Sequence, residues 1–265
     1  MLYFTTIGST NDVAASLGAD TSAEGTVVIA DAQTAGRGRR GRMWFSPPAS
    51  GLYVSVVLSP GRSKVDPARA TTLLTLAAGV ALAEGIERAT GLSPGIKWPN
   101  DLLVGRRKLA GILAETVAAD DPRRPADTRD GRSESGSPAR GTRDPMNVVL
   151  GYGINVGPMA YPPDLRDRAT SLETELGRMV DRMLVCVETL VALSAQYRDL
   201  VDGRFDVILD AWRRRAPSHQ GAHVSWETPT GRQAGVTEGI DDHGALLVRV
   251  SDRVERIVAG EVTWV

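Results

Sequence analysis

The hydrophobic positions of this chain repeat with two periods, one helical and one strand-like. Apolar residues at helical spacing predict long helices over residues 66–91, 179–201 and 205–215, and a short helix over 13–17. Runs rich in β-branched residues predict strands, and these runs lie at 26–30, 52–58, 95–98, 102–104, 109–117 and 148–156. The first 215 residues therefore mix helices and strands.

Local signals mark the ends of several of these elements. Asp66 is a helix cap and Pro67 suits a first helical turn, so the first long helix begins there and closes at Gly91. Residues 9–12 offer several caps for the short helix, which ends at Gly18.

Beyond Pro217 the pattern changes to short alternating runs. Strands are predicted at 223–226, 233–237, 245–250 and 256–258, with glycine, aspartate and serine turns between them. Regularly spaced short strands predict a small β-barrel. We place a domain boundary near Ala216, with one domain over residues 1–215 and a second over 216–265.

Residues 118–147 differ from the rest of the chain. They contain six acidic residues and six arginines but no Val, Ile, Leu or aromatic residue. Such a segment cannot bury enough apolar area to offset the entropy of ordering it. We expect a disordered insertion between two strands, without a chemical role.

Composition narrows the function only modestly. The formal net charge is −1 and charged residues make up 24%, so no overall field draws the chain to nucleic acid or membrane. The one cysteine, Cys186, excludes an intrachain disulfide and fits a reducing, cytoplasmic environment. No Cys/His spacing resembles a zinc site, residues 1–6 do not resemble a signal peptide, and the apolar run 73–83 is too short to span a membrane.

Against this neutral background, residues 36–44 form a concentrated basic loop, Gly-Arg-Gly-Arg-Arg-Gly-Arg-Met-Trp. Glycines allow successive backbone N–H groups to cradle an anion, and arginines add forked donors that match carboxylate and phosphate. The loop also spells G-x-G-x-x-G, but Pro47 and Pro48 follow where a dinucleotide-binding fold needs a helix. By itself, the loop leaves two interpretations open, an anion site and a solvated basic hairpin.

Four further motifs accompany the loop in a fixed order. The chain contains Ser-Thr-Asn at 9–11, a longer loop motif at 33–44, Lys-Trp-Pro-Asn-Asp at 97–101, Lys-Leu-Ala-Gly-Ile-Leu at 108–113, and Gly-Tyr-Gly-Ile-Asn at 151–155. Together they resemble the biotin protein ligases, from Ser9 to the C-terminus. The resemblance implies an α+β fold: a central mixed or antiparallel sheet packed by helices, similar to class II synthetases. It also implies an SH3-like C-terminal barrel, with 260–262 as its closing strand.

The resemblance also implies the reaction. Biotin and ATP, with Mg²⁺, would form biotinyl-5′-AMP, and a lysine of a biotin carboxyl carrier domain would then receive the biotin. Arg39 would hold the carboxylate–phosphate junction, Lys108 would stabilise charge in both steps, and Asp101 would lie near the acyl carbon. The biotin-binding residues implied are Ser9, Thr10, Asn11, Gln33, Gly36, Arg37, Gly38, Arg39 and Lys108. The nucleotide-binding residues implied are Arg39, Arg40, Arg42, Trp44, Asn100, Lys108 and Asn155.

Plainer interpretations stand beside these roles. Residues 9–11 could serve as a helix cap, Trp44 and Trp98 as core aromatics, and Asn155 as a strand end. Lys108 could be a solvated turn cation, and Arg40 and Arg42 could face solvent. Among functions, a lipoate or octanoate ligase of the same fold and a nucleic-acid-binding module are the alternatives.

Three expectations concern the context of the protein. Many bacterial members of the family carry an N-terminal DNA-binding domain, whereas this chain begins almost at the Ser-Thr-Asn motif, so we expect no DNA partner. Met43 stands where the family often has a basic residue. A homodimer joined along a sheet edge is expected from the resemblance alone.

Overall fold

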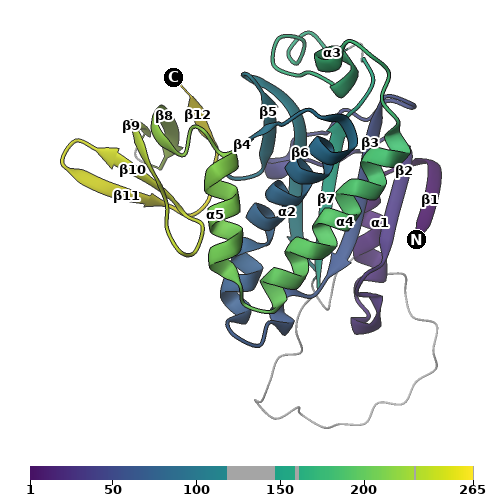
Figure 1. Ribbon diagram of the computed structural model, residues 1–265, viewed down its shortest axis with the longest axis horizontal. Coiled ribbons are helices and arrows are strands. Elements are labelled where there is room, and N and C mark those ends of the chain that lie inside the picture. The colour runs from purple at the N-terminus through teal and green to yellow at the C-terminus, as the bar shows by residue number, and fades with distance from the viewer. Residues whose placement is uncertain (118–146, 159–160, 230, 265) are drawn as a thin grey trace.

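The computed structural model describes residues 1–117, 147–158, 161–229 and 231–264. A seven-stranded sheet, in the order β1-β2-β3-β7-β6-β5-β4, forms the larger unit (Figure 1). β1 pairs with β2 in parallel, and the other neighbours are antiparallel, which confirms the predicted mixed sheet. The strands are β1 (Leu2–Ile7), β2 (Val27–Gln33), β3 (Gly51–Leu58), β4 (Gly95–Lys97), β5 (Asp101–Val104), β6 (Arg107–Thr116) and β7 (Val148–Asn155).

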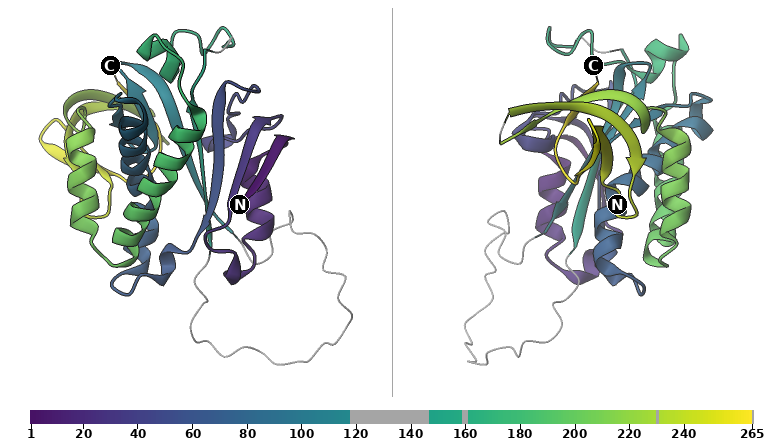
Figure 2. Two further views of the ribbon diagram at one scale, coloured as in Figure 1. Left: turned by 45° about the vertical axis from the view of Figure 1, so that its right-hand side comes forward. Right: turned by 90° about the vertical axis from the view of Figure 1, so that its left-hand side faces the viewer.

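Helices cover the sheet on both faces (Figure 2). On one face α2 (Pro67–Thr90) and α4 (Arg182–Val201) pack side by side, and α5 (Phe205–Arg215) lies against α2. On the other face α1 (Thr10–Leu17) packs over β2, β3 and β7 through a small core that includes Ala14, Val28 and Val57. Short helical turns η1 (Thr21–Ala23), η2 (Arg39–Gly41) and η3 (Pro60–Arg62) and the five-residue α3 (Leu172–Leu176) complete the unit.

The predicted helix signals act as expected at α2. The Asp66 carboxylate accepts a hydrogen bond from the Arg69 N–H at 2.9 Å, and Gly91 ends the helix with a left-handed φ of 81°. α4 starts three residues later than predicted, because Asp181 accepts hydrogen bonds from the N–H groups of Met183 and Leu184 and so sets its first turn.

The expectation that the apolar run is too short to span a membrane is wrong. The apolar run 73–83 belongs to a helix of 24 residues, which is long and apolar enough to cross a bilayer. However, 72% of its most apolar window is buried inside the protein, so this helix belongs to the core and packs against the sheet, α4 and α5.

Among the strands and α-helices, two were not predicted from the sequence. β1 is an edge strand whose side chains are mostly exposed, so it lacks the alternation that burial imposes. α3 is too short to show a helical period. β2 also extends beyond the predicted 26–30, and it carries Gln33 to the end of the strand.

The C-terminal unit is a five-stranded antiparallel sheet in the order β11-β10-β9-β8-β12, consistent with the SH3-like barrel that the resemblance implied. Its strands are β8 (Gln220–Thr228), β9 (Gly231–Ile240), β10 (Leu246–Val250), β11 (Arg253–Ile257) and β12 (Val262–Trp264). The expected boundary near Ala216 lies in the connection between α5 and β8. Trp98 is buried, as a core aromatic would be, and its indole Nε1 donates to the Gly244 carbonyl at 2.9 Å, which ties the two units together.

The predicted insertion 118–147 lies outside the described residues, apart from its last position. Asn147 is buried, and its side-chain amide donates to the carbonyls of Gly18 and Asp20 at 2.8 and 2.9 Å. The Val117 N–H donates to the Asn147 carbonyl at 2.9 Å. Asn147 therefore fixes the point at which β7 begins.

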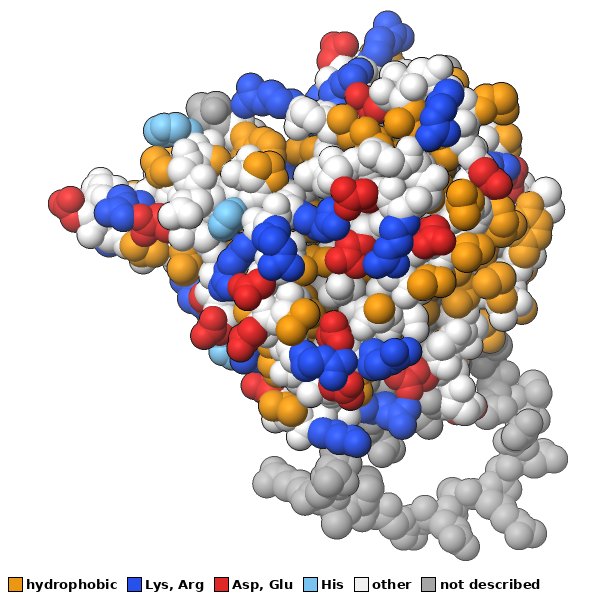
Figure 3. Space-filling model, in the orientation of Figure 1, with side chains coloured by type: hydrophobic (Ala, Val, Ile, Leu, Met, Phe, Trp, Pro, Cys, Tyr) orange, Lys and Arg blue, Asp and Glu red, His pale blue; other side chains and the backbone are white. Residues whose placement is uncertain are grey.

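Charged side chains of both signs are interspersed over the face drawn in Figure 3.

Gly85 allows α2 and α4 to approach closely. A Cβ at this position would lie 2.5 Å from Thr189 Cα and 2.6 Å from its N, both backbone atoms. We expect Gly85→Ala to lower the free energy of unfolding by about 1–3 kcal/mol through overpacking. Gly79→Ala on the same helix is the control, because its Cβ would meet Ile96 Cγ2 at an ordinary 3.5 Å. This variant should gain up to about 1 kcal/mol from helix propensity. Urea unfolding of both variants checks this, and equal stability would contradict the packing argument.

Candidate active site

A cleft opens on the face of the sheet that α1 covers. It collects the start of α1, the end of β2, the basic loop 36–44 and the middle of β6 and β7. Ten of the predicted site residues line it: Ser9, Thr10, Asn11, Gln33, Arg37, Gly38, Arg39, Trp44, Asn100 and Lys108. Segments far apart in the chain, each carrying one of the five motifs, therefore meet at one place.

Glycines in β6 and β7 make room for the cleft. A Cβ at Gly153 or Gly111 would overlap the Trp44 ring, and a Cβ at Gly151 would overlap the Asn11 side chain. These three positions lie on one face of adjacent strands. Because glycine has no side chain, the Trp44 ring and the Asn11 side chain pack directly on the backbone of the sheet there. The motifs contained these glycines, but the sequence analysis did not count them among the site residues.

Hydrogen bonds fix the polar end of the cleft. The Gln33 side-chain oxygen accepts from the Thr10 N–H at 2.9 Å and from its hydroxyl at 3.1 Å, and its amide donates to Ser46 Oγ at 2.9 Å. Ser9 is buried beside them and makes no capping hydrogen bond with its side chain. Ser9 thus occupies the N-cap position of α1 without a side-chain capping bond, and it also lines the cleft.

The guanidinium of Arg37 is held by two carboxylates. Its Nη1 lies 2.7 Å from Asp12 Oδ1, and its Nη2 lies 2.5 Å from Glu115 Oε1. The second oxygen of Glu115 accepts from the Asn11 amide at 3.0 Å. Glu115 therefore joins the basic loop to α1 across β6. No sequence signal pointed to Glu115, which follows the Lys-Leu-Ala-Gly-Ile-Leu motif by two residues.

Arg39 differs because its direct partner is neutral. Its Nη1 donates to Asn100 Oδ1 at 2.9 Å, and the Asn100 amide donates in turn to the Ile112 carbonyl at 2.8 Å. Burial lowers the pKa of Arg39, while the negative charge of Asp101 opposes that shift. The group remains a cation at any ordinary pH. Arg39 thus presents a fixed positive charge at the mouth of the cleft.

Lys108 is paired as well. Its Nζ lies 2.6 Å from Asp101 Oδ1 and 5.2 Å from the centre of the Trp44 ring. The ammonium is attracted by the carboxylate and by the face of the indole. Asp101 does not line the cleft but acts on it through Lys108. The interpretation of Lys108 as a solvated turn cation does not fit this geometry.

Four other predicted residues are absent from the cleft lining: Gly36, Arg40, Arg42 and Asn155. Gly36 is buried behind it, where a Cβ would lie 2.5 Å from the Trp44 carbonyl oxygen. Arg40 is exposed and adopts a left-handed φ of 59°. Arg42 is exposed and pairs with Glu261, Nη2 to Oε2 at 2.6 Å. This ion pair raises the pKa of Arg42 and lowers that of Glu261, and it links the basic loop to the C-terminal unit.

The side-chain amide of Asn155 is already engaged in the protein. It donates to the Thr170 carbonyl at 2.9 Å and to the Lys108 carbonyl at 3.4 Å. Asn155 therefore closes β7 and supports the backbone of Lys108, which agrees with its plainer interpretation as a strand end. Its expected contact with adenine stays a prediction.

Comparison with known proteins agrees with the motifs. A profile of the Biotin/lipoate A/B protein ligase family matches residues 3–122, and one of the Biotin protein ligase C terminal domain matches residues 220–263. The chain is 34% identical to the Bifunctional ligase/repressor BirA of Bacillus subtilis over 264 residues, which cover 99% of this chain and 73% of that protein. The chain belongs to the biotin protein ligase family.

Further members of the family agree in sequence and in structure. The Biotin--[acetyl-CoA-carboxylase] ligase of Mycobacterium tuberculosis is 34% identical, with 96% of this chain and 85% of that protein covered. The biotin protein ligase from Aquifex aeolicus, solved in complex with biotin and ATP, superposes with a TM-score of 0.77 at 25% identity. That match covers 99% of this chain and 97% of the other, so both units of the fold are shared.

The position of Glu115 leads to a stability prediction. In Glu115→Ala, Arg37 and the Asn11 amide each lose a charged acceptor in a partly buried site. We expect the free energy of unfolding to fall by about 2 kcal/mol. Asp12→Ala is the control: its carboxylate is 42% exposed against 25% for Glu115, and an exposed pair contributes about 0.5 kcal/mol. Urea unfolding of both variants measures the difference, and equal losses would argue against a bridging role.

Proposed function

We propose that this chain is an ATP-dependent biotin protein ligase. It would join biotin to AMP and then transfer biotin to a lysine of a biotin carboxyl carrier domain. The observation that carries the proposal is the convergence of Arg39 and Lys108 on one cleft, whose far end is the Thr10–Gln33 hydrogen-bond network. The family membership and the names of its relatives support the same reaction.

The first step must bring two anions together. A carboxylate oxygen of biotin attacks the α-phosphorus of ATP, the bond to the bridging oxygen of the β-phosphate breaks, and pyrophosphate leaves. Repulsion between carboxylate and triphosphate is strong in a partly dehydrated site. Arg39 and Lys108 supply fixed positive charge, and its stabilising effect increases as negative charge develops on the α-phosphate. Arg37 contributes its backbone, since two carboxylates hold its side chain.

The second step transfers the acyl group. The lysine amine of the acceptor attacks the acyl carbon of biotinyl-5′-AMP, the bond to the phosphate oxygen breaks, AMP leaves, and the amine loses a proton. Lys108 would stabilise the developing charge on the acyl oxygen and the leaving phosphate. Asp101 holds Lys108 at 2.6 Å and so fixes where that charge is available.

The ureido head of biotin fits the polar end of the cleft. A urea needs both donors and acceptors, and Ser9, Thr10 and Gln33 offer hydroxyl and amide groups there. The apolar chain of biotin would lie beside Trp44, along the part of β6 and β7 where glycines leave the sheet without side chains.

Mg²⁺ fits this site as a companion of ATP. Magnesium commonly uses one or two carboxylates and the phosphates of its substrate. Within the described ranges, no group of three His, Cys, Asp or Glu side chains is placed to hold a metal ion. Asp101, which is paired with Lys108, is the carboxylate that would support a metal carried by the triphosphate. When bound, Mg²⁺ would neutralise charge on the phosphates.

The direct test is modification of an acceptor. Incubation with biotin, MgATP and an apo biotin carboxyl carrier domain should increase the intact mass of the carrier by one biotinyl group. The same reaction with lipoate or octanoate in place of biotin tests the alternative ligase of this fold. Modification by lipoate with none by biotin would overturn the assignment.

Lys108 gives the sharper mutational prediction. Lys108→Ala should slow biotin-dependent ATP–pyrophosphate exchange by about 10²–10³-fold, because one preorganised charge at the reacting phosphate is lost. Lys64→Ala is the control, since Lys64 is exposed and remote from the cleft. Thermal unfolding of Lys64→Ala should stay near that of the unmodified protein, whereas Lys108→Ala should unfold at a somewhat lower temperature because Asp101 loses its charged partner, so exchange is measured well below both transitions. An exchange rate unaffected by Lys108→Ala would show that Lys108 does not act on the reacting groups.

A further inference from the structure

A chain of hydrogen-bonded polar groups lies beneath the polar end of the cleft. Ser55 of β3 is fully buried, and its Oγ lies 2.6 Å from Asn11 Oδ1 and 2.8 Å from Thr10 Oγ1. The Asn11 amide donates to Glu115 Oε2 at 3.0 Å, and Glu115 Oε1 accepts from Arg37 Nη2 at 2.5 Å. Neither Ser55 nor Glu115 lines the cleft, so each would act on a ligand only through its neighbours.

Thr10 connects this chain to Gln33. The side-chain oxygen of Gln33 accepts from both the N–H and the hydroxyl of Thr10, at 2.9 and 3.1 Å. Both residues line the cleft. A continuous run of polar contacts therefore extends from the guanidinium of Arg37 to the end of the cleft where the proposed function places the urea of biotin.

The carboxylate of Glu115 determines the direction of the hydrogen bonds along this chain. A carboxylate paired with a guanidinium only accepts hydrogen bonds, so the Asn11 amide turns its NH2 group toward Glu115 and its oxygen toward Ser55. Because an amide oxygen cannot donate, the single hydroxyl proton of Ser55 goes to Asn11. The hydroxyl proton of Thr10 is then directed inward, to Ser55 or to Gln33. Thr10 consequently presents a lone pair to the cleft.

A neutral amide at position 115 would remove this constraint. Glutamine offers both an acceptor and a donor, so the Asn11 amide could be bonded either way round. With its NH2 group toward Ser55, the Ser55 hydroxyl would donate to Thr10, and the Thr10 proton would be released toward the cleft. The N–H groups of a urea need an acceptor, so this arrangement opposes their binding.

We infer that Glu115 is a positioning residue that sets the hydrogen-bonding polarity of the biotin pocket. It acts through Asn11 and Ser55 on the hydroxyl of Thr10, and Arg37 holds its carboxylate in place. This inference rests on the proposed function, because it identifies Thr10 as an acceptor for the urea of biotin. It adds two residues, Glu115 and Ser55, to those on which biotin binding depends.

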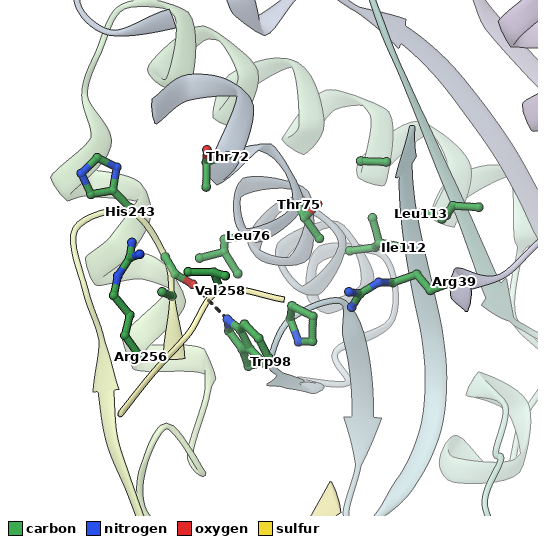
Figure 4. A pocket seen from close by; sticks show the side chains of 14 residues that line it. Arg39, Thr72, Thr75, Leu76, Trp98, Ile112, Leu113, His243, Arg256 and Val258 are labelled. Carbon is green, nitrogen blue, oxygen red and sulfur yellow. Dashed lines mark hydrogen bonds between the residues drawn. The ribbon is translucent and has the colours of Figure 1, made fainter. Parts of the chain in front are cut away.

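The groups assigned to the reacting phosphate lie outside this chain. Arg39 also lines a second cleft, of about 230 Å³, between α2, β6 and the C-terminal unit, and its side chain points into that space (Figure 4). Lys108 is held by Asp101. Neither of these contacts involves Glu115, so a change at Glu115 should weaken the binding of biotin without altering the charge available to the α-phosphate.

Two conservative variants test the chain, Glu115→Gln and Ser55→Ala. Glutamine keeps the size of the side chain and loses its charge, and alanine removes only a buried hydroxyl. The matched control is Glu238→Gln, because Glu238 pairs with Arg249 in the C-terminal unit and is 26% exposed, against 25% for Glu115. Each variant is measured by biotin-dependent ATP–pyrophosphate exchange and by calorimetric titration with biotin alone.

We expect Glu115→Gln and Ser55→Ala each to raise the KM for biotin in exchange about tenfold, because each disrupts a buried hydrogen bond that orients the pocket. The dissociation constant for biotin should rise by the same factor. The KM for ATP and the kcat of exchange should stay within about twofold, because the charges at the α-phosphate are retained. Glu238→Gln should behave as the unmodified protein.

The double variant distinguishes positioning through this chain from a general loss of stability. If Glu115 and Ser55 act through the same hydrogen bonds, the two changes together should raise the KM for biotin no further than the larger single change. Independent effects would multiply to about 100-fold. Multiplication would show that Glu115 acts by another route, and it would overturn the inference.

The remaining outcomes separate the inference from the proposed function. An unchanged KM and dissociation constant for biotin in both single variants would refute the role of Glu115 and leave the ligase function intact. A lower kcat with an unchanged KM for biotin would also refute it. Circular dichroism checks folding, and if Glu115→Gln does not fold, an unchanged KM in Ser55→Ala refutes the inference by itself. Absence of biotin binding and of exchange in the unmodified protein would instead refute the proposed function.

Discussion

Mutual repulsion among positive charges is the constraint on which this active site depends. Four arginines crowd into seven residues of one loop, and Lys108 lies across the same cleft. Carboxylates from distant elements balance most of this charge: Asp12 and Glu115 hold Arg37, Glu261 holds Arg42, and Asp101 holds Lys108. Arg39 instead donates to the neutral amide oxygen of Asn100, so this hydrogen bond leaves its positive charge uncompensated.

Three glycines of the sheet make this arrangement possible because they have no side chains. Gly111, Gly151 and Gly153 lie where any Cβ would collide with Trp44 or Asn11. Without those atoms, the indole lies flat against β6 and β7, and the Lys108 ammonium is placed over its ring. The cation and its aromatic partner thus depend on glycines in β6 and in the adjacent β7, and the site is a property of the sheet as much as of the loop.

The C-terminal unit takes part in the same electrostatic arrangement. Glu261 pairs with the basic loop, the Gly244 carbonyl accepts from Trp98, and His243 and Arg256 line a cleft that ends at Arg39. The seam between the two units therefore includes Arg39. The C-terminal unit thus holds the basic loop through Glu261 and the β4–β5 turn through Gly244.

Local rules in the sequence were enough to determine most of the elements and most of the candidates for chemistry. Asp66, Pro67 and Gly91 set the ends of α2 because capping acts within one turn, and the five motifs named most of the residues that line the cleft. Only the tertiary structure decided how the charges are shared. Arg37 meets Glu115 across 78 residues of chain, and Arg42 meets Glu261 across 219. Pairing at such separations follows from strand order and packing, which leave no short-range pattern, so Glu115, the exposed edge strand β1 and the structural bonds of Asn155 became visible only in the fold.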